Sequence, residues 1–408
     1  MIVPMVSGGR RFLRYSMSTN SLDKADLPLN GILVLDFSQF LAGPVAAMRL
    51  ADLGARVIKI ERPGTGDIGR TLAFAGLEKD GDTLSFHIMN RNKESFAADL
   101  KSSDALREVR ELIKQADVII QNFRPGVIER LGLGYEEVKK INPRIVYASA
   151  TGYGAEGPFK DRPGQDLLAQ SISGLPWLNG RAGDPPIPVG LAVADIFTST
   201  HVASGVIALL LRRERTGKGG LIESSLLESM LDLQFELISA NLFDPNVVVN
   251  RGAGNSAHAF LPAPYGLYKT ENGYLAIAMT PIPALGTLLG LDLSEYEDPK
   301  SWWSHQEGIM KKLSAQLSTN STDHWLAILD AADIWCAPVL TLPELVAHEG
   351  FAAIDMKQET QRTGKDGAQV LIPTTRSPMR IDGKTIKHTK GAPHVGEDTE
   401  HIRKEFGI

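Results

Sequence analysis

The strongest constraint on the fold is a regular alternation of strand-like and helix-like stretches through the first 150 residues. Apolar runs typical of buried strands cover residues 31–36, 56–61, 95–100, 117–122 and 144–149. Helical patterns lie between them at 43–54, 104–115 and 135–141, and the first of these has proline near its start and glycine at its end. Such alternation favours right-handed βαβ units, so the sequence predicts an α/β fold with a doubly wound parallel sheet.

The chain has 408 residues, which is too long for one simple core and favours two domains. Beyond Pro245, a glycine-rich loop, a hairpin turn at 271–274 and helical patterns at 302–317 and 322–331 indicate a smaller α+β domain. We therefore divide the chain into an N-terminal lead (1–27), a large Rossmann-like domain (28–225), a connecting helix with the small domain (226–340), and a C-terminal segment that returns to the large domain (341–408).

Composition excludes several classes of function. A net charge of -5 gives no nucleic-acid footprint and no basic membrane surface. The nine histidines are scattered without paired spacing and Cys336 is the only cysteine, so we expect neither a metal site nor a disulfide. The loop after residues 31–36 lacks the G-x-G-x-x-G fingerprint, so a nicotinamide or flavin site is poorly supported, although Glu61 stands where a ribose-binding acid is expected.

A single thiol suits a reducing compartment, and we expect a cytoplasmic protein. The first 22 residues contain Arg10, Arg11 and Arg14 and no acid. An unstructured lead explains this composition, and a transit peptide to the mitochondrial matrix is the alternative.

One long apolar segment follows a proline-rich stretch and contains a single carboxylate. Asp195 is the only formal charge between Asp184 and Arg212. The segment also carries His201 and several hydroxyls, so it predicts a buried core helix rather than a membrane span. From the residues alone, Asp195 is either a helix cap or a catalytic group.

Basic residues follow several of the predicted strands. They are either solvated strand ends or a phosphate-binding rim on the ligand side of the sheet: Arg62, Lys93, Lys101, Arg124 and Arg130.

An ordered series of motifs resembles the class III CoA-transferases, the family of formyl-CoA transferase, carnitine CoA-transferase and α-methylacyl-CoA racemase. The series runs from about Leu29 to the C-terminus and is densest before Met230. Its members include Leu41-Ala-Gly-Pro44, Glu61-Arg-Pro-Gly64, Asn90-Arg-Asn-Lys93, Asn122-Phe-Arg-Pro-Gly126, Ala194-Asp195 and Arg215-Thr-Gly-Lys-Gly219.

This resemblance implies that Asp195 is the nucleophile of a CoA-transferase. CoA would move from an acyl-CoA to a small free carboxylic acid through an aspartyl–acyl anhydride and an aspartyl-CoA thioester. The resemblance also implies an interlocked homodimer and no metal, nicotinamide or flavin. The implied CoA contacts are Gln39, Leu41, Ala42, Arg62, Leu100, Lys101, Asn122, Phe123, Arg130 and Gln165.

Two further positions bear on the branch of the family and on the substrate. The racemases carry histidine in a Gly-His-Asp motif, and this chain has Gln165 there, which cannot exchange a proton at neutral pH. The transferase reading is therefore favoured, with a racemase or epimerase as the alternative. We expect the glycine-rich loop with Gly252, Gly254 and His258 to close over Asp195, and a second substrate carboxylate would suit the residues between Arg251 and His258.

Overall fold

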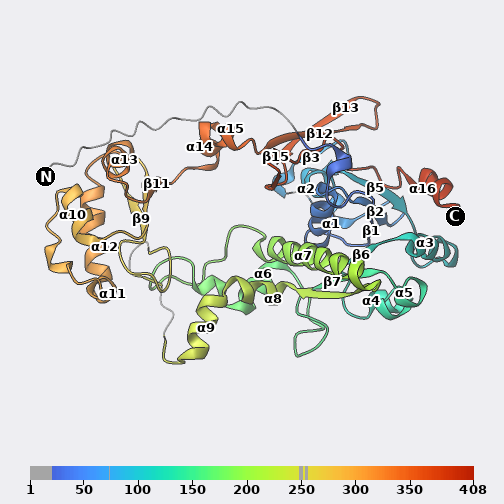
Figure 1. Ribbon diagram of the computed structural model, residues 1–408, viewed down its shortest axis with the longest axis horizontal. Coiled ribbons are helices and arrows are strands. Elements are labelled where there is room, and N and C mark those ends of the chain that lie inside the picture. Colours follow the sequence, from blue (N-terminus) through green and yellow to red (C-terminus); the bar gives the residue numbers. More distant parts are fainter. Residues whose placement is uncertain (1–20, 73, 248–250, 253–255) are drawn as a thin grey trace.

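The computed structural model describes residues 21–72, 74–247, 251–252 and 256–408. Its centre is a six-stranded sheet in which every neighbouring pair of strands is parallel (Figure 1). The strands are β1 (Leu33–Asp36), β2 (Arg56–Glu61), β5 (Lys93–Ala97), β6 (Val118–Gln121), β7 (Val146–Thr151) and β8 (Gly220–Ser225). Their order, β5-β2-β1-β6-β7-β8, is that of doubly wound nucleotide-binding sheets, and it confirms the predicted parallel α/β architecture.

Helices cover both faces of this sheet because side chains alternate along each strand. Val34 and Val57 lie in the core on the side of α1 (Ala42–Asp52) and α7 (Val193–Thr216). Leu35 and Ile58 lie in the core on the opposite side. The helices of that second face are α3 (Ser103–Gln115), α4 (Val127–Arg130), α5 (Tyr135–Ile141) and α16 (Thr399–Phe406). Burial on both faces explains why the strands read as continuous apolar runs.

Two boundaries differ from those expected from the sequence. In the six-stranded sheet, β5 begins at Lys93 rather than at residue 95, because the Lys93 ammonium is buried and paired inside the sheet layer instead of ending the strand at solvent. The connecting helix expected from residue 226 onward is two helices, α8 (Leu226–Leu233) and α9 (Phe235–Phe243), separated at Gln234. Ser225 fixes the start of α8, since its hydroxyl accepts from the Glu228 amide at 3.1 Å.

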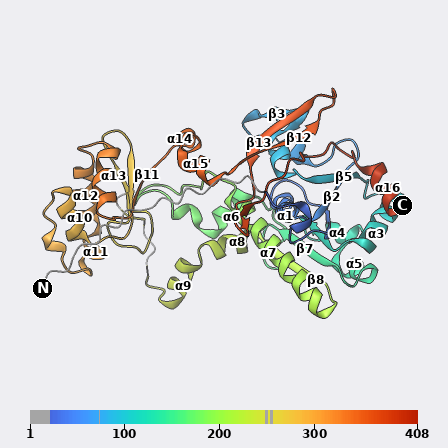
Figure 2. The same cartoon turned by 45° about the horizontal axis from the view of Figure 1, so that its top comes forward.

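A second lobe stands apart from the six-stranded sheet, and the chain reaches it and leaves it along two separate stretches (Figures 1 and 2). Its antiparallel sheet contains β9 (Gly266–Lys269), β10 (Tyr274–Ile277) and β11 (Cys336–Pro338). Its helices are α10 (Ile282–Leu289), α11 (Ser301–Ser304), α12 (Gln306–Leu317) and α13 (Thr322–Ala331). These elements enclose a hydrophobic core of their own, which includes Tyr268, Leu313 and Trp325.

The last part of the chain passes back along the large lobe. It comprises α14 (Leu342–Ala347), α15 (Glu349–Ile354), the hairpin β12 (Lys357–Thr363) and β13 (Gln369–Thr375), the hairpin β14 (Arg380–Ile381) and β15 (Lys384–Thr385), and α16. Arg362 of β12 pairs with Asp80 and Asp82, and Ile402 of α16 is buried in the core beside α3. At the other end of the chain, the Leu22 amide donates to the Thr385 carbonyl, while residues 1–20 of the expected lead lie outside the described residues.

The helix that carries Asp195 is the longest of those described, and its length and composition alone would suit a membrane span. One side of α7 packs into the core through Val202, Val206 and Leu210. Its other side leaves Ile196 and Leu211 exposed. The helix is therefore a core element with one uncovered face.

Candidate active site

Asp195 is the third residue of α7, and its carboxylate is held by a neighbouring helix rather than by its own. The carboxylate accepts a hydrogen bond from the backbone N–H of Ala42, the first residue of α1. The helices α1 and α7 pack side by side from these starting points. Two helix beginnings therefore meet at Asp195, and the free N–H groups of both favour an anion there.

The cap of α7 is a different carboxylate. Asp166, the first residue of α6 (Asp166–Ser173), accepts a hydrogen bond from the Asp195 amide on Oδ2 at 3.0 Å. Its other oxygen accepts from the side chain of Gln170. Because Asp166 satisfies the first turn of α7, the Asp195 carboxylate is not consumed as a cap of its own helix.

Burial raises the pKa of Asp195, and the nearby Asp166 carboxylate raises it further, to about 7. The Ala42 N–H opposes this rise because it stabilises the ionised form. The result is a carboxylate that is far more basic than an ordinary aspartate and still substantially ionised at neutral pH.

The loop between β1 and α1 lies at the topological switch point of the sheet, between β1 and β6. Asn122, which follows β6, accepts from the Gln39 amide at 2.8 Å and donates to the Gln39 carbonyl at 2.7 Å. Glycine is required at residue 43, because a Cβ there would stand 2.2 Å from the Ser38 Cβ. Ligands of doubly wound sheets bind in the crevice at this point, so the loop that holds Asp195 also forms a wall of the expected ligand crevice.

Two fully buried lysines hold this loop in place. The Lys59 ammonium donates to the Ser38 carbonyl at 2.8 Å and pairs with Asp67 at 2.8 Å. The Lys93 ammonium donates to the Pro44 carbonyl at 2.9 Å, at the opposite end of the loop. Asp67 also accepts from the amide of Phe40, which has a left-handed backbone with φ of 65°. The loop is thus clamped at both ends and near its middle.

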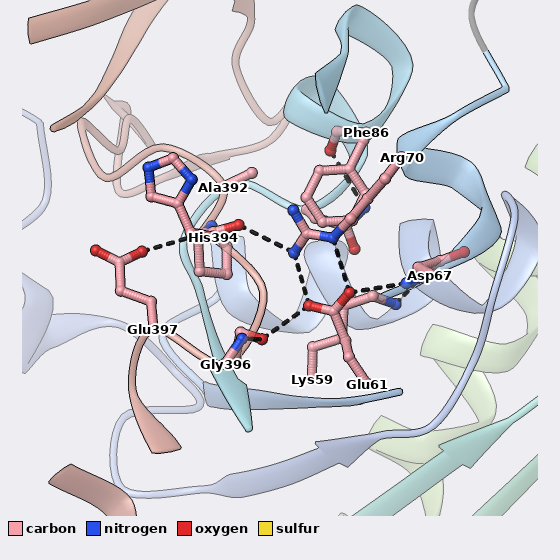
Figure 3. A network of polar contacts seen from close by, with 12 residues as sticks. Lys59, Glu61, Asp67, Arg70, Phe86, Ala392, His394, Gly396 and Glu397 are labelled. Atoms are coloured by element: carbon pink, nitrogen blue, oxygen red, sulfur yellow. Dashed lines mark hydrogen bonds and ion pairs between the residues drawn. The ribbon is translucent and has the colours of Figure 1, made fainter. Parts of the chain in front are cut away.

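The same polar network joins the loop after β2 to the C-terminal segment (Figure 3). Glu61 pairs with Arg70 at 2.7 Å and accepts from the Asp67 amide at 2.9 Å. The Arg70 guanidinium stacks on the Phe86 ring at 3.7 Å and donates to the Pro393 carbonyl. Glu61 is therefore committed to structure and is not placed to bind a ribose.

The expected CoA contacts gather at one edge of the sheet. Parallel strands present their carboxyl ends together, and the residues that directly follow β1, β2, β5 and β6 include Gln39, Arg62, Leu100 with Lys101, and Asn122 with Phe123. Arg62, Lys101 and Arg130 are exposed, and among the described residues none of the three forms an ion pair. Free cations on this edge suit phosphate groups. Lys93, in contrast, is buried inside the sheet layer and is not part of such a rim.

The remaining expected site residues divide into two groups. Leu41 and Ala42 form the start of α1 beside Asp195, and Gln165 is the exposed residue before α6, next to Asp166. In the glycine-rich loop, Gly252 accepts from the Ala182 amide, His258 pairs with Glu236 of α9 at 3.4 Å, and Gly254 lies outside the described residues.

Arg251 is fully engaged by the segment before α7. Its guanidinium donates to the carbonyls of Asn179, Asp184 and Pro185 and lies over the Trp177 ring. Its donors therefore hold the glycine-rich loop against that segment instead of pointing to a ligand.

Similarity to known proteins identifies the family. A family model described as CoA-transferase family III matches residues 29–399. The chain belongs to this family. Succinyl-CoA:glutarate CoA-transferase of Mus musculus is 34% identical over 93% of this chain and 86% of its own length. The β subunit of succinyl-CoA–L-malate CoA-transferase from Chloroflexus aurantiacus is 37% identical over 93% of this chain and 94% of its own length.

A solved structure shows the same fold. A CAIB/BAIF family protein from Brucella suis superposes with a TM-score of 0.79, is 31% identical, and is covered over 99% of its length by 93% of this chain. These similarities establish that this class III protein is a CoA-transferase, which acts on an acyl-CoA and a carboxylic acid. The resemblance inferred from the motifs is thereby confirmed.

Sequence reasoning missed the residues that act through others at this site. Asp166 directly follows Gln165, and the sequence indicates a structural role for it, such as a helix cap. The sequence does not show that it caps α7 by accepting from the Asp195 amide, 29 residues further along the chain. Lys59 lies inside an apolar strand, where a charge is a signal of a buried partner, but the sequence does not say that the partner is Asp67.

Proposed function

We propose that this CoA-transferase uses Asp195 as a covalent nucleophile and that its substrates are short dicarboxylic acids. The observation that carries the proposal is the Asp195 carboxylate itself: it sits at the meeting point of two helix starts, beside the switch-point crevice, while Asp166 caps its helix.

The reaction balances without a proton being gained or lost. An Asp195 oxygen attacks the carbonyl carbon of the donor thioester, and the C–S bond breaks to give an aspartyl–acyl anhydride and the CoA thiolate. The thiolate attacks the aspartyl carbonyl, which releases the donor acid as a carboxylate and leaves CoA on Asp195 as a thioester. The acceptor carboxylate attacks this thioester and expels the thiolate, which then takes the acceptor acyl group and frees Asp195.

The environment of Asp195 suits these steps in two ways. A pKa of about 7 makes the carboxylate more basic than an ordinary aspartate, and nucleophilicity rises with basicity. Burial also limits the access of water, which would hydrolyse an anhydride. Positioning also contributes to the reaction rate, because the Ala42 N–H and the clamped loop fix the Asp195 carboxylate before the substrate binds.

The CoA portion of the substrate fits the edge that carries the exposed cations. Arg62, Lys101 and Arg130 would meet its phosphates, and Gln39 and Asn122 at the switch point would lie beside the chain that leads to the thioester. The proposed acids follow from the relatives, whose names specify succinyl-CoA with glutarate or L-malate.

The proposal includes an interlocked homodimer. The chain crosses between the two lobes along two stretches (Figure 2), and large apolar side chains are exposed along these stretches and on the neighbouring α8 and α9. Exposed apolar groups of this kind are typical of interfaces. They include Leu231, Phe235, Leu242, Phe243, Trp335, Leu342 and Val346. Light scattering should give twice the mass of the 44.3 kDa chain, and a monomeric mass would contradict this part of the proposal.

The nucleophile is tested by replacing Asp195. Asp195→Asn and Asp195→Ala should abolish transfer from succinyl-CoA to glutarate while the affinity for CoA, measured by calorimetry, changes little. Transfer at a near-normal rate in either variant would refute the mechanism, and exposed Asp104→Asn is the matched control.

A further inference from the structure

An open cleft lies along α1 and reaches the residues next to Asp195. It has a volume of about 780 Å³ and is lined by α1, α2 (Leu84–Met89), α6, the segment 188–192 before α7, and β13. Most of its lining is apolar, for example Val45, Met48 and Val189. A volume and lining of this kind are typical of small-molecule sites.

The cleft reaches the immediate neighbours of Asp195. Leu41 precedes the residue whose N–H holds Asp195, Asp166 contacts the Asp195 amide, and Ala192 and Ile196 flank Asp195 along the chain. Residues on both sides of Asp195 in the chain therefore line this cleft.

One cation in the cleft has no carboxylate partner. Arg49 of α1 is half-buried, and its Nε donates to the Ser199 hydroxyl at 3.3 Å. Among the described residues no carboxylate lies within ion-pair distance of Arg49, and the nearby Asp52 is paired with Arg91 at 2.7 Å. A partly desolvated guanidinium without a counter-ion is unfavourable unless a ligand supplies one.

The position of Arg49 matches the length of a short dicarboxylate. Ser199 follows Asp195 by one turn of α7, and four residues correspond to about 6 Å along a helix. The Arg49 guanidinium contacts Ser199 and therefore lies about one helical turn further along α7 than Asp195. This spacing suits the separation of the two carboxylates in succinate or glutarate.

We infer that Arg49 binds the distal carboxylate of the acyl group and of the acceptor acid, and so selects dicarboxylates over monocarboxylates. The inference rests on the proposed function and assigns a residue to its substrate specificity. The other charged groups of the cleft do not compete for this role: Arg91 is neutralised by Asp52, and both oxygens of Asp166 already accept hydrogen bonds. Arg251, near which the sequence suggested a second carboxylate, is engaged by backbone carbonyls.

The test compares acids that differ only in the distal carboxylate. The specificity constant kcat/KM is measured with succinate and butyrate as acceptors of CoA from glutaryl-CoA, and with glutarate and pentanoate as acceptors of CoA from succinyl-CoA, for the wild type, Arg49→Met and Arg49→Lys. Arg49→Met keeps an unbranched, flexible side chain and removes the guanidinium charge, and exposed Arg107→Met is the matched control. The melting temperature of each variant reports on folding.

The wild type should prefer the dicarboxylate of each pair. Arg49→Met should lower kcat/KM for the dicarboxylates by roughly 10- to 150-fold, the range of a lost charged hydrogen bond, and should leave the monocarboxylates unchanged within about 3-fold. For the dicarboxylates, the kcat/KM of Arg49→Lys should lie between those of the wild type and Arg49→Met, because lysine keeps the charge and loses the forked geometry of the guanidinium.

An unselective wild type, or an equal effect of Arg49→Met on both members of a pair, overturns the inference about Arg49. The proposed function survives either result as long as the wild type transfers CoA and Asp195→Asn does not. A wild type that transfers CoA to none of these acids, with an intact fold, counts against the proposed substrate class itself.

Discussion

Replacing Asp195 with asparagine should stabilise the protein at neutral pH while it removes the proposed nucleophile. The asparagine Oδ1 can still accept from the Ala42 N–H, so the packing and the hydrogen bond are retained. What is removed is a negative charge that burial and the Asp166 carboxylate disfavour. Active sites commonly hold such groups at the expense of stability.

The sign and size of this stability difference follow from the coupling between proton binding and folding. The pKa of Asp195 is raised from 3.8 to about 7 on folding, so between these values the folded state holds a proton that the unfolded state has released. The contribution of Asp195 therefore lowers the stability of the wild type as the pH rises from 4 to 7, and this contribution is absent from the asparagine variant. At 1.36 kcal/mol per pKa unit, the advantage of the variant should grow by up to about 2.7 kcal/mol between pH 5 and pH 8, and by less where water screens the half-buried side chain.

Urea denaturation of both proteins at pH 5, 6, 7 and 8 measures this difference. The free energy of unfolding of Asp195→Asn should exceed that of the wild type by an amount that increases with pH and levels off above pH 7. Exposed Asp104→Asn should differ from the wild type by less than about 0.5 kcal/mol at every pH. A pH-independent difference, or a wild type more stable than Asp195→Asn at pH 8, would falsify the argument.

Three further predictions address the site. The value of kcat/KM should rise with pH through about 7 as Asp195 ionises. Asp166→Asn removes the second cause of the raised pKa and should move the midpoint of this rise to lower pH. An unchanged midpoint would mean that the two carboxylates do not interact. Lys59→Met should lower the free energy of unfolding by about 3–5 kcal/mol, because Asp67 remains buried without a counter-charge and Asp36 keeps only Lys93. Exposed Lys114→Met should change it little, and equal effects of the two variants in a denaturant titration would contradict this. In deuterated water an α-methylacyl-CoA without acceptor acid should take up no α-deuterium, because Gln165 cannot act as the second base; uptake would favour the racemase alternative.

The fold was largely predictable because its signals are local. Apolar runs and helix-end signals located the strands and helices of the large lobe to within a few residues. The failures occurred where a long-range contact overrides the local pattern. Lys93 is inside β5 because Asp36, on a distant strand, neutralises it, and the break at Gln234 divides an otherwise continuous apolar helix.

The site was predictable only in part. The motif around Asp195 identified a candidate nucleophile, and the strand ends identified the residues at the edge where we propose that CoA binds. The cap that Asp166 provides for α7, and the clamp of Lys59 and Lys93 on the loop at Ser38 and Pro44, depend on contacts between elements that no sequence spacing specifies. The unpaired state of Arg49 is likewise visible only once its neighbours are placed.

The most direct test of the account is mass spectrometry of the protein after it has been mixed with succinyl-CoA and no acceptor acid. The account predicts a CoA thioester on the peptide that contains Asp195. The adduct should disappear when glutarate or hydroxylamine is added, and it should be absent from Asp195→Asn. Wild-type protein that transfers CoA rapidly but carries no adduct, or carries it on another residue, would contradict the central claim.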